Sequence, residues 1–346
     1  MPSSKLILFT PGPVRIPPLV AQYLADPPCN YHRQDAFREM FAATEADLKV
    51  LLGLRDPGAY FATLLTATGT GANEACLEAF AALGKGLLLC NGFFGARLVA
   101  QARQNGLAHV LLESAADRPI DPDAVDAALR ANPDVKWVYF VSHETRTGLV
   151  NPMVEIGRAC KRHGVLVGAD IVSSAYAYPL DIEAAQLDLA VASSAKALMA
   201  VPGIGIVFVR LASVPALAAV RRRGYYLDVI AELEKQKKES QTRFAQPVAL
   251  HAALRAAVLH LKQVGIDVHM RRIRSQMDQI VAGLETIGIR AQLDPAYRSW
   301  IAVNFGLPAG LEYPAFARSM EARGYYLLYG IPGAASHFQV STIGDL

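Results

Sequence analysis

The sequence has few cysteines and no long apolar run at its start, and each shortage excludes a class of protein. Its cysteines form no CxxC pair, so neither a metal site such as zinc nor a disulfide framework is predicted. The first apolar run, Leu6 to Phe9, meets a Pro-Gly-Pro turn after four residues, which is typical of neither a signal peptide nor a membrane anchor. We therefore expect a soluble, cytoplasmic protein with no membrane partner and with reduced, buried thiols at Cys29, Cys76, Cys90 and Cys160.

Charge is also scarce. Charged residues make up 19% of the chain and the formal net charge is +3, so no nucleic-acid partner is predicted. The one basic cluster, Arg221 to Arg223, is more typical of a solvated helix end than of a phosphate-binding patch. A GxGxxG fingerprint is missing, which argues against a dinucleotide-dependent oxidoreductase.

Apolar residues, in contrast, are plentiful. At 346 residues and 52% hydrophobic content, the chain is expected to form one large α/β domain and a smaller one. Prolines before residue 30 forbid a long helix and predict an irregular N-terminal arm over residues 1–30. The predicted large, cofactor-binding domain then covers residues 31–240, and a small α+β domain covers residues 241–346.

Strand-like apolar runs alternate with amphipathic helical patterns up to residue 210, which predicts an α/β fold with a mostly parallel, doubly wound sheet flanked by helices. Beyond it, helices and short strands predict the smaller domain. The predicted strands lie at 59–67, 86–90, 109–114, 137–143, 165–170, 189–195, 204–210, 299–306, 325–330 and 337–344. The predicted helices lie at 35–52, 68–83, 94–106, 122–132, 152–163, 226–239, 251–265, 270–288 and 313–323.

Two ionisable residues follow buried strands of this sheet. Asp170 ends the run VLVGAD, and Lys196 follows LAVASSA. Open α/β sheets place ligand sites at such strand ends. A lysine among apolar and small residues loses its proton by desolvation and suits Schiff-base chemistry, while an aspartate keeps a pyridine nitrogen protonated. Together the two predict a site for pyridoxal 5'-phosphate (PLP), although either alone is more typical of a core edge or a surface.

Three further segments end strands with polar or small residues. The turn Thr68-Gly69-Thr70 opens a helix and favours an anion, although most such turns are merely tight turns. Phe94 lies between glycines, where it is either a platform for a planar ring or a core aromatic. Thr145 and Arg146 lie in a run of polar residues. The Thr145 hydroxyl is expected to bond a cofactor ring, and the Arg146 guanidinium to bind an acidic substrate through two hydrogen bonds.

The order of these motifs resembles the class V aminotransferases of the aspartate-aminotransferase fold. The similarity is carried by TPGP, ATGTGANEA, NGFFGAR, HETRTGLVNP, ADIVSS and SSAKALMAVPGIG, and it extends to YYLDV, RFAQP and the C-terminal FQVSTIGDL. It covers essentially the whole chain in the right order.

The resemblance implies a PLP-dependent transaminase. Lys196 is expected to bond covalently to the cofactor and to move protons, and Asp170 to pair with the pyridinium nitrogen. Phe94 is expected to stack on the ring and Thr145 to bond near its phenolic oxygen. Such enzymes are homodimers whose sites the partner completes, here with residues 243–247. The phosphate is expected to bind Thr68, Gly69, Thr70 and Ser194.

Three positions depart from the family's pattern. Ala195 stands where Asn or Gln usually precedes the lysine, and Ala245 where a threonine usually reaches the partner's phosphate site. Gln339 stands where an arginine usually grips the acidic group of the substrate. We therefore assign substrate binding to Gln339 and Arg146, with Arg146 supplying the missing charge from another wall; a surface or dimer-contact role for Arg146 is an equal alternative.

The function expected from the resemblance is transfer of an amino group between a small amine or amino acid, of the 2-aminoethylphosphonate type, and a keto acid. The alternative is a PLP-dependent lyase or bond-forming enzyme on the same scaffold, because Gln339 replaces the usual arginine. A cofactor-binding protein without catalysis is disfavoured by the presence of both Lys196 and Asp170.

Overall fold

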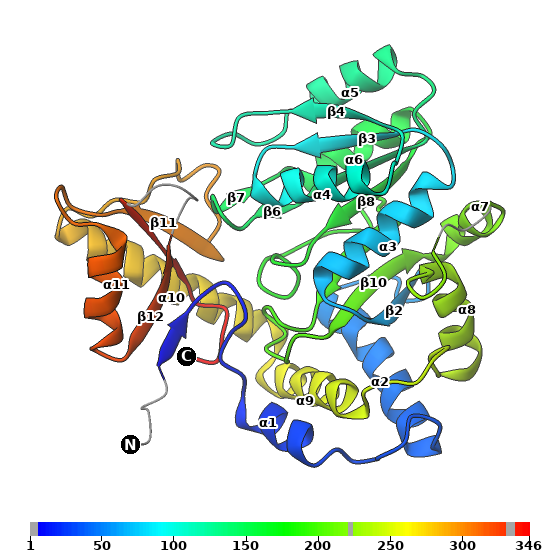
Figure 1. The fold of residues 1–346 in the computed structure, drawn as a ribbon, viewed down its shortest axis with the longest axis horizontal. Helices are drawn as coiled ribbons and strands as arrows, with labels where there is room; N and C mark the ends of the chain where they lie inside the picture. Colours follow the sequence, from blue (N-terminus) through cyan, green and yellow to red (C-terminus); the bar gives the residue numbers. More distant parts are fainter. Residues whose placement is uncertain (1–5, 221–223, 330–335) are drawn as a thin grey trace.

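The computed structural model describes residues 6–220, 224–329 and 336–346 (Figure 1). The basic cluster at 221–223 and the end of the strand predicted at 325–330 therefore lie outside the described residues. The four cysteines are buried and free of disulfide bonds, as predicted. Among the described residues, no helix is both long enough and apolar enough to cross a membrane.

The larger sheet confirms the predicted α/β architecture. Within the described residues it has seven strands in the order β2-β10-β9-β8-β5-β3-β4. Strand β10 runs antiparallel to both of its neighbours, and the other neighbouring pairs are parallel. The strands are β2 (Tyr60–Thr66), β3 (Gly86–Cys90), β4 (His109–Glu113), β5 (Trp137–Val141), β8 (Leu166–Asp170), β9 (Leu189–Ser193) and β10 (Ile204–Arg210).

Helices cover both faces of this sheet (Figure 1). Strands β3, β5 and β9 are buried at every residue, which is why they are continuous apolar runs rather than alternating patterns. The helices packed around the sheet are α2 (Asp35–Leu52), α3 (Gly69–Ala81), α4 (Phe93–Gln104), α5 (Pro122–Ala131), α6 (Met153–Arg162), α7 (Val214–Ala218) and α8 (Val229–Glu239). Strand β5 is followed by a two-stranded ladder of β6 (His143–Glu144) and β7 (Leu149–Val150).

A smaller sheet lies beside the large domain, where β1 of the N-terminal segment pairs with the C-terminal strands (Figure 1). Its order is β1-β12-β13-β11 among the described residues. It consists of β1 (Ile7–Phe9), β11 (Ala302–Gly306), β12 (Tyr325–Tyr329) and β13 (His337–Ser341), with helices α10 (Ile266–Thr286) and α11 (Tyr313–Glu321).

The packing differs from the predicted domain limits in two places. The N-terminal segment is not irregular throughout, because it forms β1 and the short helix α1 (Pro18–Ala25), whose prolines occupy the helix start, where no backbone N–H is needed. Helix α9 (Val248–Val264), expected in the small domain, packs against α1 and α2 and contributes to the core of the large one. These contacts favour a division at the start of α10.

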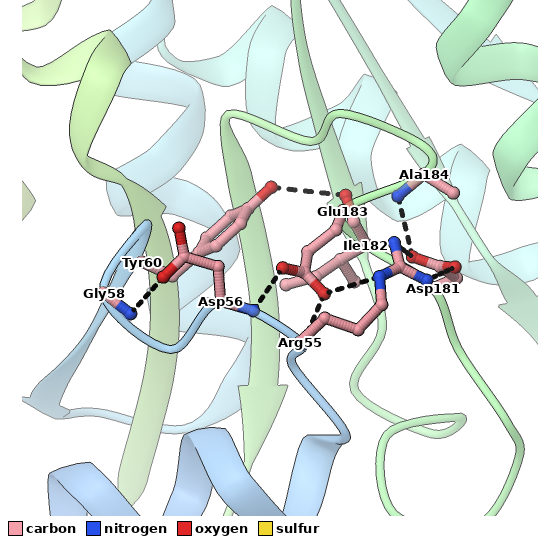
Figure 2. Close-up of polar contacts among 8 residues, drawn as sticks. All are labelled: Arg55, Asp56, Gly58, Tyr60, Asp181, Ile182, Glu183 and Ala184. Atoms are coloured by element: carbon pink, nitrogen blue, oxygen red, sulfur yellow. Dashed lines mark hydrogen bonds and ion pairs between the residues drawn. The ribbon is translucent and has the colours of Figure 1, made fainter.

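A polar cluster closes the end of the large sheet where β9 begins (Figure 2). The guanidinium of Arg55 binds both carboxylate oxygens of Asp181, at 2.7 and 3.0 Å. The carboxylate of Glu183 accepts the backbone N–H groups of Arg55 and Asp56, and the Tyr60 hydroxyl donates to the carbonyl of Leu187 at 2.8 Å. The cluster fixes this loop end and leaves the opposite end of β9 to form a site.

Candidate active site

A cavity of about 190 Å³ opens where β8 and β9 end. Its position matches the rule that ligands bind at the carboxyl ends of parallel strands. Of the residues predicted from the sequence, Thr68, Gly69, Thr70, Phe94, Thr145, Asp170 and Lys196 line it, whereas Arg146, Ser194 and Gln339 do not. The other lining residues are Gly12, Pro13, Asn73, Arg97, Leu98, Gln101, Val141, His143, Val172, Ser173, Ser193, Ala195 and Pro202.

Asp170 is held in one orientation at the end of β8. One carboxylate oxygen accepts the backbone N–H of Val172 at 2.8 Å, and the other accepts the side-chain amide of Asn73 at 2.6 Å. The hydroxyl of Tyr139 donates to the Asn73 oxygen at 2.8 Å, which fixes the amide so that its NH₂ faces Asp170. Burial raises the pKa of Asp170, while these two hydrogen bonds and the charge of Lys196 oppose the shift.

Lys196 lies in the turn after β9, under the N-terminal segment. Its Nζ donates to the carbonyl of Pro11 at 3.1 Å. Gly12 leaves the space for it: a Cβ on Gly12 would lie 2.6 Å from Nζ, and the backbone φ of +133° also favours glycine. Burial, together with the charges of Arg97 and Arg146, lowers the pKa of Lys196 to about 8, while Asp170 opposes the shift.

The turn Thr68-Gly69-Thr70 begins α3 at the same edge. Thr68 is the N-cap residue, and its side chain caps no backbone N–H, so the helix start offers free donors toward the cavity. Gly69 packs closely, because a Cβ there would lie 2.8 Å from Val172 and 3.4 Å from the Cβ of Ser193. Ser194 is fully buried and its hydroxyl donates to the carbonyl of Val201, whereas the neighbouring Ser193 lines the cavity.

Phe94 is positioned by a buried carboxylate. Glu144 accepts the backbone N–H of Phe94 at 3.0 Å and that of Gly95 at 2.6 Å, and so caps the N-terminus of α4. A Cβ on Gly92 would lie 2.5 Å from the carboxylate carbon, so this contact needs glycine. Burial raises the pKa of Glu144 to about 7, against the effect of the two N–H donors.

The segment between β6 and β7 carries Thr145 and Arg146. Thr145 lines the cavity, while the Arg146 guanidinium lies over the Phe93 ring, 5.4 Å from its centroid. Gln339 on β13 is fully buried behind this segment. Its side-chain nitrogen donates to the carbonyl of Thr145 at 2.7 Å and also contacts the Arg146 carbonyl and the Asn304 side chain.

His143, which the sequence did not single out, connects the cavity wall to the segment that precedes β11. Ser299 accepts the backbone N–H groups of Ile301 and Ala302, so its hydroxyl hydrogen is available to His143 Nε2, 2.8 Å away. This partner assigns the ring hydrogen to Nδ1, which then donates to Ser173 at 2.8 Å. Burial, with the charge of Lys196, lowers the pKa of His143 to about 3, so the ring is neutral at physiological pH.

Other lining residues were also not predicted. Arg97 lies three residues after Phe94 on α4, a spacing that places both on one helix face, and this was the available signal. Asn73 lies in the first turns of α3, where its amide faces Asp170. Gly12 reaches the site only through tertiary folding, and no local pattern identifies it.

The segment 243–247, expected to serve a partner subunit, lies outside the cavity lining. The Arg243 guanidinium lies over the rings of Tyr225 and Phe244, at 5.2 and 4.8 Å from their centroids. Tyr225 is 77% exposed and Tyr226 is 48% exposed, so two large aromatic side chains are left on the surface here. The role of this segment stays a prediction.

Comparison with known proteins agrees with this geometry. Residues 35–321 match the family described as Aminotransferase class-V. A 2-aminoethylphosphonate–pyruvate transaminase of Burkholderia pseudomallei is 32% identical over 351 aligned positions, covering the whole of this chain and 94% of the relative. An aspartate aminotransferase of subgroup IV from Thermus thermophilus superposes with a TM-score of 0.86 at 28% identity, over 98% of this chain and 94% of that one. An alanine–glyoxylate aminotransferase from Nostoc sp. superposes with a TM-score of 0.89 at 25% identity, over 99% of this chain and 90% of that one. The chain therefore belongs to the class V aminotransferases.

Proposed function

We propose that this transaminase uses PLP in the cavity at the carboxyl ends of β8 and β9 and transfers the amino group of a small, acidic amine to a keto acid. The observation that carries the proposal is the meeting of Lys196 and Asp170, from the ends of two neighbouring parallel strands, in one cavity. The relative from Burkholderia, named for 2-aminoethylphosphonate and pyruvate, supports this substrate pair.

The residues present fit the cofactor. Asp170 is a buried carboxylate with a fixed orientation, suited to a protonated ring nitrogen. Phe94 offers an aromatic face, and Thr145 a hydroxyl, on the cavity wall. The free N–H groups at the start of α3 suit a phosphate, with the side chains of Thr68, Thr70 and Ser193 beside them. Ser194 remains a candidate only if its hydroxyl leaves the Val201 carbonyl.

When bound, PLP supplies an electron sink for the carbon that carries the amino group. Lys196 then holds and moves the proton at that carbon through its Nζ. Its pKa of about 8 places the amine near the balance of acid and base at physiological pH, where proton transfer is most efficient. A positioned base of this kind contributes roughly 10²–10⁴-fold to the rate. Asp170 keeps a negative charge against the ring nitrogen throughout.

We assign recognition of the acidic end of the substrate to Arg146 rather than to Gln339. The side-chain nitrogen of Gln339 is committed to backbone carbonyls, and the residue has no exposed surface. Arg146 follows Thr145, which lines the cavity, and its charge acts on Lys196. Changing Arg146 to Ala is expected to raise KM for an acidic substrate and to leave PLP affinity unchanged. An unchanged KM would reject this role.

We further propose a cytoplasmic homodimer. The exposed rings of Tyr225 and Tyr226 beside Phe244, in the segment expected to reach a partner, support association with a second copy. Four free, buried thiols suit a reducing compartment. Light scattering during size-exclusion chromatography tests the dimer: a mass near twice that of the chain supports it, and the mass of one chain contradicts it.

Absorbance of the PLP-loaded protein tests the reaction. We expect 2-aminoethylphosphonate to convert the visible cofactor band to that of the amine form, and pyruvate to restore it. A band that persists with this amine but shifts with another would remove the phosphonate assignment. Turnover of the amine without any keto acid would favour the lyase alternative.

A further inference from the structure

Arg97 occupies a place in the cavity that the function proposed above leaves unexplained. It projects from α4 one turn after Phe94, and its guanidinium carbon lies 4.8 Å from the centroid of the Phe94 ring. Its Nη1 lies 3.3 Å from the hydroxyl oxygen of Thr70, at the start of α3. The guanidinium therefore connects the aromatic wall of the cavity to the anion-binding turn.

The balance of charge around the cavity gives Arg97 a specific task. Among the described residues that line the cavity, the charged side chains are Asp170, Lys196 and Arg97, and His143 is neutral. Lys196 bonds to the cofactor and must lose its charge to do so. Arginine stays protonated at every physiological pH, so Arg97 is the permanent cation of this lining.

We propose that Arg97 binds the phosphate group of the cofactor, together with the backbone N–H groups at the start of α3. The proposal rests on the use of PLP proposed above. A helix N-terminus carries roughly half an elementary charge, which leaves most of the charge of a phosphate dianion unbalanced. A guanidinium adds a full charge and a planar fork of donors that matches phosphate oxygens.

A role toward the acidic end of the substrate is the competing assignment, and the contacts favour the phosphate. Thr70, the partner of Arg97, belongs to the helix start itself, and Gln101 one turn later on α4 donates to the Thr70 carbonyl at 2.9 Å. Two side chains of α4 thus hold the same residue of the turn. Arg146, which lies outside the cavity lining, remains the cation for the substrate.

Comparing PLP with pyridoxal, which has the same aldehyde and ring but no phosphate, isolates this contact. Equilibrium dissociation constants of both ligands are measured by absorbance titration of cofactor-free wild-type protein, Arg97→Met, Arg97→Lys and a control, Arg103→Met. Arg103 lies on the same helix and is exposed, so its substitution by Met removes the same charge away from the cavity. A lost charge-assisted contact is expected to weaken PLP binding about 10- to 100-fold in Arg97→Met.

Pyridoxal affinity should stay within about threefold of wild type in every variant, because pyridoxal has no phosphate group for residue 97 to bind. A tenfold change would need about 1.4 kcal/mol of lost interaction. Arg97→Lys should fall between Met and wild type. An unchanged ratio of PLP to pyridoxal affinity in Arg97→Met would overturn the proposal, and so would an equal loss of both ligands. A raised KM for the acidic substrate with unchanged PLP affinity would assign Arg97 to the substrate. Wild-type protein that binds neither aldehyde would remove the proposed function itself.

Discussion

The side-chain nitrogen of Gln339 donates to the backbone carbonyl of Thr145 at 2.7 Å, and this bond helps to join the small sheet to the wall of the cavity. The two residues are 194 positions apart in the sequence. Asn304, the neighbour of Gln339 across β11 and β13, donates to the carbonyl of Arg146 at 2.6 Å. The small sheet thus holds the segment that presents Thr145 and Arg146.

Gln339→Ala tests whether this link is structural. The change leaves the Thr145 carbonyl buried without its donor, so the free energy of unfolding should fall by about 1–3 kcal/mol. Chemical denaturation of the cofactor-free protein measures this loss. Because the segment that presents Thr145 and Arg146 loses its support, kcat should fall together with stability.

The opposite result would support the role in substrate binding that the sequence predicted for Gln339. Unchanged stability together with a KM for the acidic substrate raised at least tenfold would show that Gln339 contacts the substrate. Gln339→Leu is the matched variant, since it keeps most of the volume and still removes the donor. It should lose a similar amount of stability if the hydrogen bond is the cause.

Glu144→Gln tests the buried carboxylate that caps α4. Burial raises the pKa of Glu144 from 4.5 to about 7, so the folded protein holds this proton more tightly than the unfolded chain. The resulting stability is fully present below pH 4.5 and is lost as the pH rises to about 7. The neutral amide has no such dependence.

We therefore expect wild type to lose stability relative to Glu144→Gln as the pH rises through this window. The difference between their free energies of unfolding should change by at most about 3 kcal/mol. Urea titrations of both proteins at several pH values from 4.5 to 8 measure it. Parallel stability curves for the two proteins would show that the carboxylate titrates normally.

The pH dependence of cofactor uptake tests the lowered pKa of Lys196. Only the neutral amine attacks an aldehyde, so the rate of pyridoxal binding to cofactor-free protein should rise with pH and level off above about 8. Stopped-flow absorbance gives this profile. Because Asp170 raises the pKa of Lys196, Asp170→Asn should move the midpoint to lower pH. A midpoint near 10.5, the ordinary value, would show that the lysine is solvated.

Local patterns predicted the parts of the fold that local physics determines. Helix α2 and strand β3 have the predicted limits, because apolar periodicity and a glycine in the left-handed conformation at Gly53 mark them clearly. The meeting of Asp170 and Lys196 followed from the rule that neighbouring parallel strands end at one edge.

Features that depend on long-range packing were not predictable in this way. Strand β1 has three residues, too few for a period, and it forms only because β12 offers an edge. The contact of the Pro11 carbonyl with Lys196 joins residues 185 positions apart. The role expected for Gln339 came from the family's pattern, and the structure places its side chain behind the cavity instead of within it.

Borohydride reduction of the PLP-loaded protein, followed by peptide mass mapping, tests the central assignment most directly. Reduction fixes an amine permanently to the aldehyde carbon that it holds, so the account predicts the mass of the reduced cofactor on Lys196. Protein without PLP should remain unmodified. A label on a different lysine, or no label at all in protein that has bound PLP, would contradict the account.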